Sequence, residues 1–274
     1  MLVTVQGETT AVWRATLGSD GERAPVLSRA GIEALVSLCE RAAAPGSPCR
    51  VIVLDSTPAG FCRGMDLDAL AEDPAEQAEQ GVALYADMLA RLREARAAVI
   101  AVVRGEALAG GLGLLCAADH VIAEHGSSFA LPETTLGLVP AMVLPLLMER
   151  MPPQKARHLA LFGERLYAQR ALELGLVDMV CSEGHGERAL KRVVKALLRC
   201  EPGAVSTLKA LSGRVAPLGW RAGLSAGAET TRALLEQPSV VANVTAFVKG
   251  GEAPPWFARW RPNDDGGSAE GDSQ

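Results

Sequence analysis

Short runs rich in β-branched residues alternate along the chain with alanine- and leucine-rich stretches of helical periodicity. This alternation predicts repeated strand–helix units around a mainly parallel sheet, which is an α/β fold. Residues 3–5 and 10–16, near the start, are typical of an antiparallel hairpin. The expected parallel strands follow at residues 50–55, 98–103 and 120–123.

The alanine- and leucine-rich stretches place apolar residues three and four positions apart, as on one face of an α-helix. We expect helices at residues 28–42, with Ser28 as N-cap, and at 80–96, 112–118, 155–162, 168–174 and 186–200. Strand signals nearly vanish after residue 152, so the sequence predicts an α/β core at 1–200 and a helical region at 201–261. The last segment, 262–274, has no apolar residue larger than alanine and is expected to be disordered.

The charge balance and the cysteines exclude several classes of protein. The formal charge is −5, from 27 Lys and Arg against 32 Asp and Glu, which gives no basic signature for nucleic acid. The start of the chain lacks the basic residues and apolar core of a signal peptide, so we expect a cytoplasmic protein without a membrane partner. The six cysteines form no Cys-x-x-Cys pair, which favours reduced thiols over disulfides or a metal site.

Two glycine-containing loops, at residues 61–67 and 105–113, each connect a predicted strand to a predicted helix. A helix N-terminus presents unpaired N–H groups, and glycine allows the backbone to approach a ligand closely. Two such loops facing one point would form an oxyanion hole, although either loop alone is better explained as turn chemistry. The second loop lacks both the Gly-x-Gly-x-x-Gly and the Gly-Lys-Ser/Thr patterns, so a nucleotide site is not expected.

Five segments resemble, in this order, motifs of the crotonase, or enoyl-CoA hydratase/isomerase, superfamily. They are FCRGMDL at 61–67, ALAGGLG at 107–113, ADHVIA at 118–123, FALPETTLGL at 129–138 and ALELGLVDMV at 171–180. The resemblance implies a ββα spiral core with a C-terminal helical region that forms trimers or hexamers. It also implies an oxyanion hole for a thioester enolate, with the backbone amides of Met65 and Gly110 as donors.

Hydratases of this superfamily use two glutamates, and the resemblance places these at Gly113 and Glu133. The chain therefore retains one of the two carboxylates. A single carboxylate is still able to remove an α-proton from a polarised thioester and to return a proton elsewhere. Dehydration and double-bond isomerisation both remain open, while the alternative role for Glu133 is that of a helix-start acid.

Further segments at 84–85, 103–105, 137–145 and 154–156 resemble the 3-hydroxy-3-methylglutaryl-acyl-carrier-protein dehydratases of polyketide β-branching. This narrower resemblance implies dehydration of the carrier-bound thioester to 3-methylglutaconyl thioester. It requires no cofactor, because the phosphopantetheine or CoA arm is part of the substrate. The alternatives are a Δ3,Δ2-enoyl-CoA isomerase and a non-catalytic scaffold with the same fold.

The distal carboxylate of such a substrate requires a hydrogen-bond donor or a cation. Arg63, Tyr85 and His120 are the candidates, each with an ordinary structural explanation as well. Residues 187–261 carry 12 Lys and Arg against 5 Glu, including several on one predicted helix. Carrier proteins are generally acidic, so this basic helix is a candidate docking surface for an acyl carrier protein.

Overall fold

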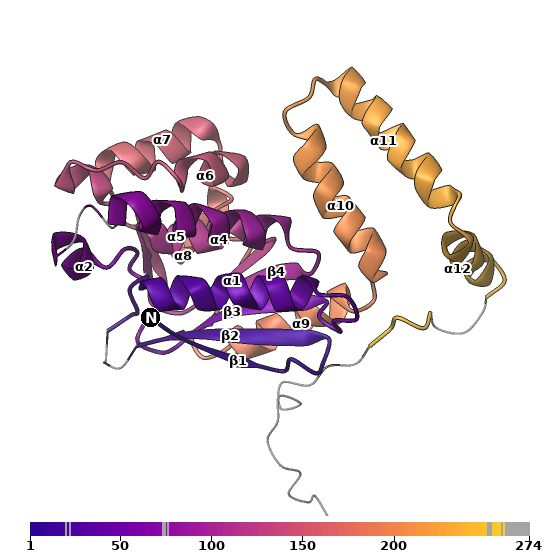
Figure 1. Cartoon of the computed structure of the whole chain (residues 1–274), viewed down its shortest axis with the longest axis horizontal. Coiled ribbons are helices and arrows are strands. Elements are labelled where there is room, and N and C mark those ends of the chain that lie inside the picture. Colours follow the sequence, from indigo (N-terminus) through magenta and orange to yellow (C-terminus); the bar gives the residue numbers. More distant parts are fainter. Residues whose placement is uncertain are drawn as a thin grey trace, which may run out of the picture. The chain divides into compact units, whose positions relative to one another are not determined.

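A largely parallel sheet lies at the centre of the computed structural model (Figure 1). The structure describes residues 1–19, 21, 23–72, 75, 77–250, 254–258 and 260. In this part of the chain the sheet has the strand order β1-β2-β3-β4-β6-β9. The strands are β1 (Leu2–Gln6), β2 (Val12–Gly18), β3 (Val51–Ser56), β4 (Ala98–Val103), β6 (His120–Glu124) and β9 (Met179–Cys181).

The sheet topology confirms the sequence-based prediction. β1 and β2 form the antiparallel hairpin, and the pairs β2–β3, β3–β4, β4–β6 and β6–β9 are all parallel. β3 and β4 are buried along their whole length, which is why β4 and the first four residues of β3 are consecutive apolar residues rather than an alternating pattern. The short strand β9 was not predicted, because three residues give too little periodic signal.

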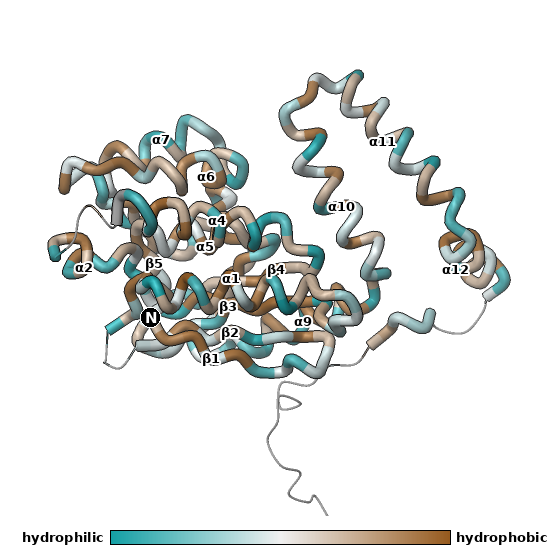
Figure 2. Tube along the Cα trace, viewed as in Figure 1, coloured by the Kyte–Doolittle hydropathy of each residue, from teal (hydrophilic) through white to brown (hydrophobic). Residues whose placement is uncertain are grey.

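One face of the sheet is covered by a row of helices in which each contacts the next. These helices are α1 (Arg29–Ala43), α4 (Val82–Glu94), α5 (Gly110–Ala117), α6 (Leu144–Arg150) and α7 (Pro153–Phe162). Ser28 caps α1 as predicted, because its hydroxyl accepts from the amide of Gly31 at 3.3 Å. Hydrophobic and hydrophilic residues alternate around α1 (Figure 2), so its apolar face packs on the sheet and its polar face is solvated.

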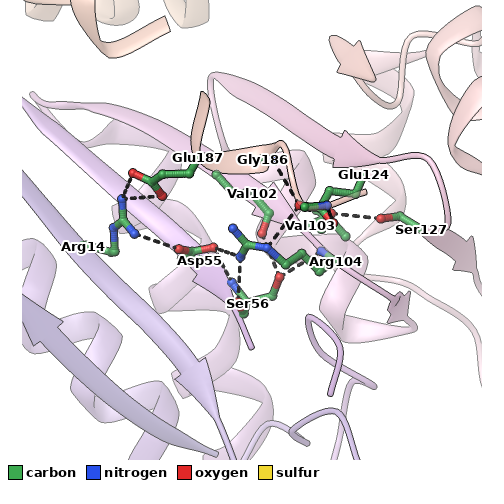
Figure 3. Close-up of polar contacts among 11 residues, drawn as sticks. Arg14, Asp55, Ser56, Val102, Val103, Arg104, Glu124, Ser127, Gly186 and Glu187 are labelled. Atoms are coloured by element: carbon green, nitrogen blue, oxygen red, sulfur yellow. Dashed lines mark hydrogen bonds and ion pairs between the residues drawn. The ribbon is translucent and has the colours of Figure 1, made fainter. Parts of the chain in front are cut away.

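The opposite face of the sheet is covered by α9 (Gly186–Leu197), which buries Ala189, Leu190 and Val194. A group of ion pairs, which we call the brace, connects the start of this helix to the strands (Figure 3). It is formed by Arg14, Asp55, Arg104, Glu124 and Glu187. In the brace, Asp55 lies between Arg14, at 3.3 Å, and Arg104. Because Asp55 is only 4% exposed, the two guanidinium groups are needed to compensate its buried charge.

A second, smaller sheet positions the loops that follow the main strands. Its strands are β5 (Glu106–Leu108), β7 (Ser128–Ala130) and β8 (Leu166–Tyr167), with β5 and β7 parallel. Short helical segments complete this part of the chain: α2 (Leu67–Glu72), the π-helix η1 (Gln77–Gly81), the 3-10 helix η2 (Glu133–Leu136) and α8 (Ala168–Glu173). The β5–β7 pairing brings the segment that contains Pro132 and Glu133 beside the second glycine loop.

The chain separates into two compact units, Met1–Val194 with Trp260, and Lys195–Arg259. The division falls within α9, a few residues before the predicted boundary at 200. The second unit contains α10 (Pro202–Val215), α11 (Trp220–Leu235) and α12 (Pro238–Val248), so the predicted helical region is helical. Among the described helices, none combines the length and the apolar character needed to cross a bilayer. The predicted disordered tail, 262–274, lies outside the described residues.

Candidate active site

The two glycine loops meet in the structure. After β3 and β4 end, the loops pair through a parallel bridge between Cys62 and Ala107, and the Leu108 amide donates to the carbonyl of Cys62 at 2.8 Å. The amide of Leu27 donates to the carbonyl of Gly64 at 2.7 Å, which fixes the end of the first loop. The loops therefore reach the same point because their parent strands are neighbours in the sheet.

Gly64 is required by the closeness of this approach. Its φ is +84°, and an added Cβ would lie 2.7 Å from the Cβ of Ala109 and 2.8 Å from the nitrogen of Gly110. Only glycine fits a left-handed conformation at that separation. The second loop is also constrained, since Ala109 is the one described non-glycine residue with a positive φ, at 50°. Such a conformation persists only where the surroundings enforce it, and it is common at functional sites.

Two backbone amides are left available where the loops meet. Met65 directly follows Gly64, and Gly110 is the first residue of α5, two residues earlier than the predicted helix start. Neither amide donates a hydrogen bond to another described residue. Both residues line one cavity, so their N–H groups are suited to bind an oxygen atom of a ligand there.

Glu133 reaches the same cavity through the second sheet. The register of β5 and β7 pairs Leu108 with Ala130, and the amide of Ala109 donates to the carbonyl of Ala130 at 2.9 Å. The chain then passes through Pro132 into η2, whose first residue is Glu133. The pairing of the two strands thus places the carboxylate beside the start of α5.

The Glu133 carboxylate is in an unusual electrostatic environment. Its Oε2 atom is buried and has no hydrogen-bond partner among the described residues. Burial raises the pKa of Glu133 above its usual value, although a hydrogen bond from its own backbone amide opposes the shift. A carboxylate that is poorly solvated and only partly satisfied is a stronger base toward a substrate than a solvated one.

The cavity has a volume of about 680 Å³ and a mostly apolar lining. Arg63, Met65, Tyr85, Gly110 and Glu133, which are five of the six predicted site residues, all line it. Apolar side chains form most of the remaining wall; they include Leu27, Ile32, Leu84, Leu108, Leu136, Leu138, Val139, Met142 and Val143. The site can therefore hold an apolar acyl group with its polar atoms directed to the amides and to Glu133.

The comparisons with known proteins identify the family. The family model described as enoyl-CoA hydratase/isomerase matches residues 40–254. The chain belongs to the enoyl-CoA hydratase/isomerase family. This confirms the predicted superfamily and, with the observed architecture, the crotonase-like fold.

Several relatives in this family are similar to the chain. Bacillaene synthase dehydratase PksH of Bacillus subtilis is 37% identical over 140 residues, which is 50% of this chain and 54% of that protein. Carnitinyl-CoA dehydratase of Proteus mirabilis is 36% identical over 153 residues, 54% of this chain and 57% of the relative. The matched segments thus span little more than half the length of these relatives, both of which are dehydratases.

The fold is also similar to that of solved family members over nearly their whole length. Pseudomonas aeruginosa AtuE is 29% identical with a TM-score of 0.85, covering 93% of this chain and 99% of that one. An enoyl-CoA hydratase/isomerase from Marinobacter aquaeolei is 27% identical with a TM-score of 0.84, at the same two coverages. The family's fold is therefore present across both compact units.

Arg63 lines the cavity and also a neighbouring surface depression, which contains Arg23 and Arg165 as well. Its Nε atom lies 3.1 Å from a carboxylate oxygen of Glu106, and Arg165 pairs with the same carboxylate at 3.3 Å. The depression is thus lined by three guanidinium groups and one carboxylate, a local excess of positive charge that suits an anionic group.

His120 does not line the cavity, unlike the other predicted site residues. It is the first residue of β6, and its Nδ1 atom lies 4.0 Å from Asp178, whose carboxylate also pairs with Arg150. Burial lowers the pKa of His120, and Arg150 adds to this effect while Asp178 opposes it. His120 therefore lies beside Asp178 and Arg150, away from the cavity, and its Nε2 atom is buried without a hydrogen-bond partner among the described residues.

Two features of the site were missed by the sequence interpretation. The segment 136–143 forms an apolar wall, although it was noted only as part of a family resemblance. Arg29, at the start of α1, also lines the cavity and hydrogen-bonds Gln80 at 2.8 Å. A charged residue in the first turn of a helix usually faces solvent, so no sequence pattern marked Arg29.

Proposed function

We propose that the protein is a hydro-lyase that removes water from a 3-hydroxyacyl thioester. One observation carries this proposal: Glu133, whose Oε2 atom has no partner among the described residues, lines the same cavity as Met65 and Gly110, whose amides are free. The amides are the oxyanion donors, and Glu133 is the base. The two dehydratase relatives support the direction of the reaction.

In the proposed reaction, the thioester oxygen accepts hydrogen bonds from the two amides while Glu133 removes the proton at C2. Stabilising the enolate oxygen in this way lowers the barrier, because preorganised donors need no solvent reorganisation. The electron pair of the enolate forms the C2–C3 double bond and expels the C3 hydroxyl. Glu133 returns its proton to that hydroxyl, which leaves as water, so one carboxylate suffices.

The proposed substrate is a 3-hydroxy-3-methylglutaryl thioester on an acyl carrier protein, which gives 3-methylglutaconyl thioester in polyketide β-branching. The bacillaene synthase relative supports this assignment. The arginine-lined depression beside the cavity, shared through Arg63, supports an anionic arm or carboxylate there. The reaction uses no cofactor beyond the phosphopantetheine of the substrate itself.

A basic segment of this chain is a candidate docking surface for the proposed carrier partner. Arg188, Lys191 and Arg192 on α9 are exposed, with Lys195 and Arg199 following along the same segment. An acidic carrier protein would be attracted to these residues, and this attraction would weaken as salt is raised.

Self-association as a trimer or hexamer is the second proposed partnership. No residue of α10, α11 or α12 is buried in the single chain. Large apolar side chains of this unit are exposed instead, among them Trp220, Leu224 and Phe247. Apolar surface of this kind is stabilised when another copy of the chain covers it.

The direct test is an assay of the purified protein and of Glu133→Gln with the substrate on a carrier protein and on CoA. We expect the wild-type protein to produce an acyl group lighter by one water, and the variant to lose this activity while keeping its fold. Near-normal turnover by the variant removes Glu133 from the mechanism. If the wild-type protein instead moves the double bond of a 3-enoyl thioester, the isomerase is the correct assignment, and inactivity on both substrates favours a scaffold.

A further inference from the structure

The phenol of Tyr85 occupies the space that a side chain at position 113 would need. Gly113 is buried in α5, one helical turn after Gly110, and an ideal Cβ built on it would lie 2.0 Å from the phenolic oxygen. That distance is far below any van der Waals contact. Tyr85 and a larger residue at position 113 are therefore mutually exclusive in this conformation.

The hydrogen bonds of the phenol are already partly assigned. Its O–H donates to the carbonyl oxygen of Gly110 at 2.6 Å. A phenol has one proton and retains acceptor capacity on its oxygen, so only its lone pairs are available to a ligand. Burial raises the pKa of Tyr85, an effect to which nearby Cys62, Cys116 and Glu133 also contribute, so the group remains a neutral phenol at physiological pH.

Tyr85 is held rigidly at this position. Its side chain is only 7% exposed and belongs to the main hydrophobic core, where its α4 neighbours Met88 and Leu89 are also buried. It lines the cavity together with Glu133. A polar atom with one fixed bond and a packed ring is preorganised to bind a hydroxyl group of the substrate.

We propose that Tyr85 accepts a hydrogen bond from the C3 hydroxyl of the substrate and holds that hydroxyl toward Glu133. This inference rests on the proposed dehydration and adds a group that selects 3-hydroxyacyl substrates. Tyr85 exchanges no proton in the reaction. The C2 proton goes to Glu133, the C3–O bond breaks, and Glu133 gives the same proton to the departing hydroxyl; the resulting water keeps the hydroxyl's own hydrogen, which is only hydrogen-bonded to Tyr85 until the water leaves.

The glycine at position 113 is part of the same arrangement. Any Cβ there would push the phenol away from Gly110 and from the substrate hydroxyl. The absence of a side chain at position 113 therefore leaves room for the Tyr85 phenol. Tyr85 is then the second side chain, after Glu133, that contacts the substrate hydroxyl.

The test separates hydroxyl binding from enolate formation. Dehydration of the 3-hydroxy-3-methylglutaryl thioester is compared with deuterium uptake at C2 of the 3-methylglutaryl thioester, which lacks the hydroxyl. For Tyr85→Phe we expect dehydration to fall about tenfold to a hundredfold, as for a lost hydrogen bond in the transition state. Deuterium uptake should change less than about threefold, because it requires only the amides and Glu133.

Tyr167→Phe is the matched control, since it removes the hydroxyl of the chain's other tyrosine, which is 61% exposed. We expect both activities of this variant to equal those of the wild-type protein. Equal losses of dehydration and exchange in Tyr85→Phe would mean that the phenol only supports the Gly110 peptide, and would overturn the proposal. No loss of either would overturn it too.

A second pair of variants tests the steric relation. Gly113→Ala should reproduce the selective loss of dehydration. Adding it to Tyr85→Phe should cause a much smaller further loss, because the 2.0 Å contact with the phenolic oxygen is absent and only the contacts of 3.2 Å to the ring carbon and 3.3 Å to Leu89 remain. Additive losses would contradict the assignment. A wild-type protein that exchanges the C2 proton but does not dehydrate contradicts the proposed function itself, and with it the role of Tyr85.

Discussion

Replacing Gly64 by alanine is predicted to damage both the stability and the activity of the protein. The added Cβ would lie 2.7 Å from the Cβ of Ala109 and 2.8 Å from the nitrogen of Gly110, so the two loops would have to separate. The same substitution places alanine at a φ of +84°, which costs roughly 1–2 kcal/mol by itself.

Gly46 provides a matched control for the conformational part of this cost. Its φ is +80°, and an added Cβ would meet nothing within 4 Å. Gly46→Ala therefore carries the left-handed strain and the same change in the unfolded chain, but no collision. Overpacking typically costs about 1–3 kcal/mol, so Gly64→Ala should be less stable than Gly46→Ala by about that amount.

Urea denaturation of the two variants measures this difference, and turnover measures its effect on the site. We expect Gly64→Ala to lose about a hundredfold or more in kcat, as when an oxyanion donor is displaced, and Gly46→Ala to keep wild-type turnover. Equal stabilities together with unchanged turnover of Gly64→Ala would refute the reasoning, because the loops would then not meet as closely as the structure shows.

Two further predictions concern stability and assembly. Because burial raises the folded-state pKa of Glu133 above its usual value, its ionisation opposes folding, and the contribution of Glu133 to stability should fall as pH rises through the raised value. Glu133→Gln should therefore gain stability relative to the wild-type protein between pH 4 and pH 8 in urea denaturation; a constant difference would contradict this. Phe247, 87% exposed on α12, should lie in the proposed self-association surface, so Phe247→Asp should lower the sedimenting mass. A wild-type protein that sediments as a single chain would contradict the assembly.

The sequence predicts the elements that bury continuous apolar runs well. The strand expected at 98–103 is found at those residues, because all six side chains are buried. The helix expected at 112–118 begins instead at Gly110, since glycines read as a loop can also form a first helical turn. This small difference matters, because it makes the Gly110 amide a free helix N-terminal donor.

The site is less predictable than the fold. Met65, Gly110 and Glu133 were placed together by family resemblance. In the structure the β5–β7 pairing brings Glu133 beside Gly110, and the Cys62–Ala107 bridge brings the loop of Met65 to the same cavity. The exclusion between Tyr85 and Gly113 involves residues 28 positions apart and depends on atomic distances, so no local pattern carries it. His120 was predicted from its residue type. A residue type suited to catalysis gives no information on where its side chain points, and His120 does not line the cavity.

The brace fixes the strand ends from which the glycine loops start, whereas the apolar wall lines the cavity itself. The Asp55–Arg104 pair joins the ends of β3 and β4, from which both glycine loops start. The segment 136–143, which forms the apolar wall, is largely exposed. Under the proposed function, this wall can change in size or polarity during evolution without reorienting the two amides. The same scaffold is therefore open to new acyl groups, and the wall is the segment to exchange when the substrate range is engineered.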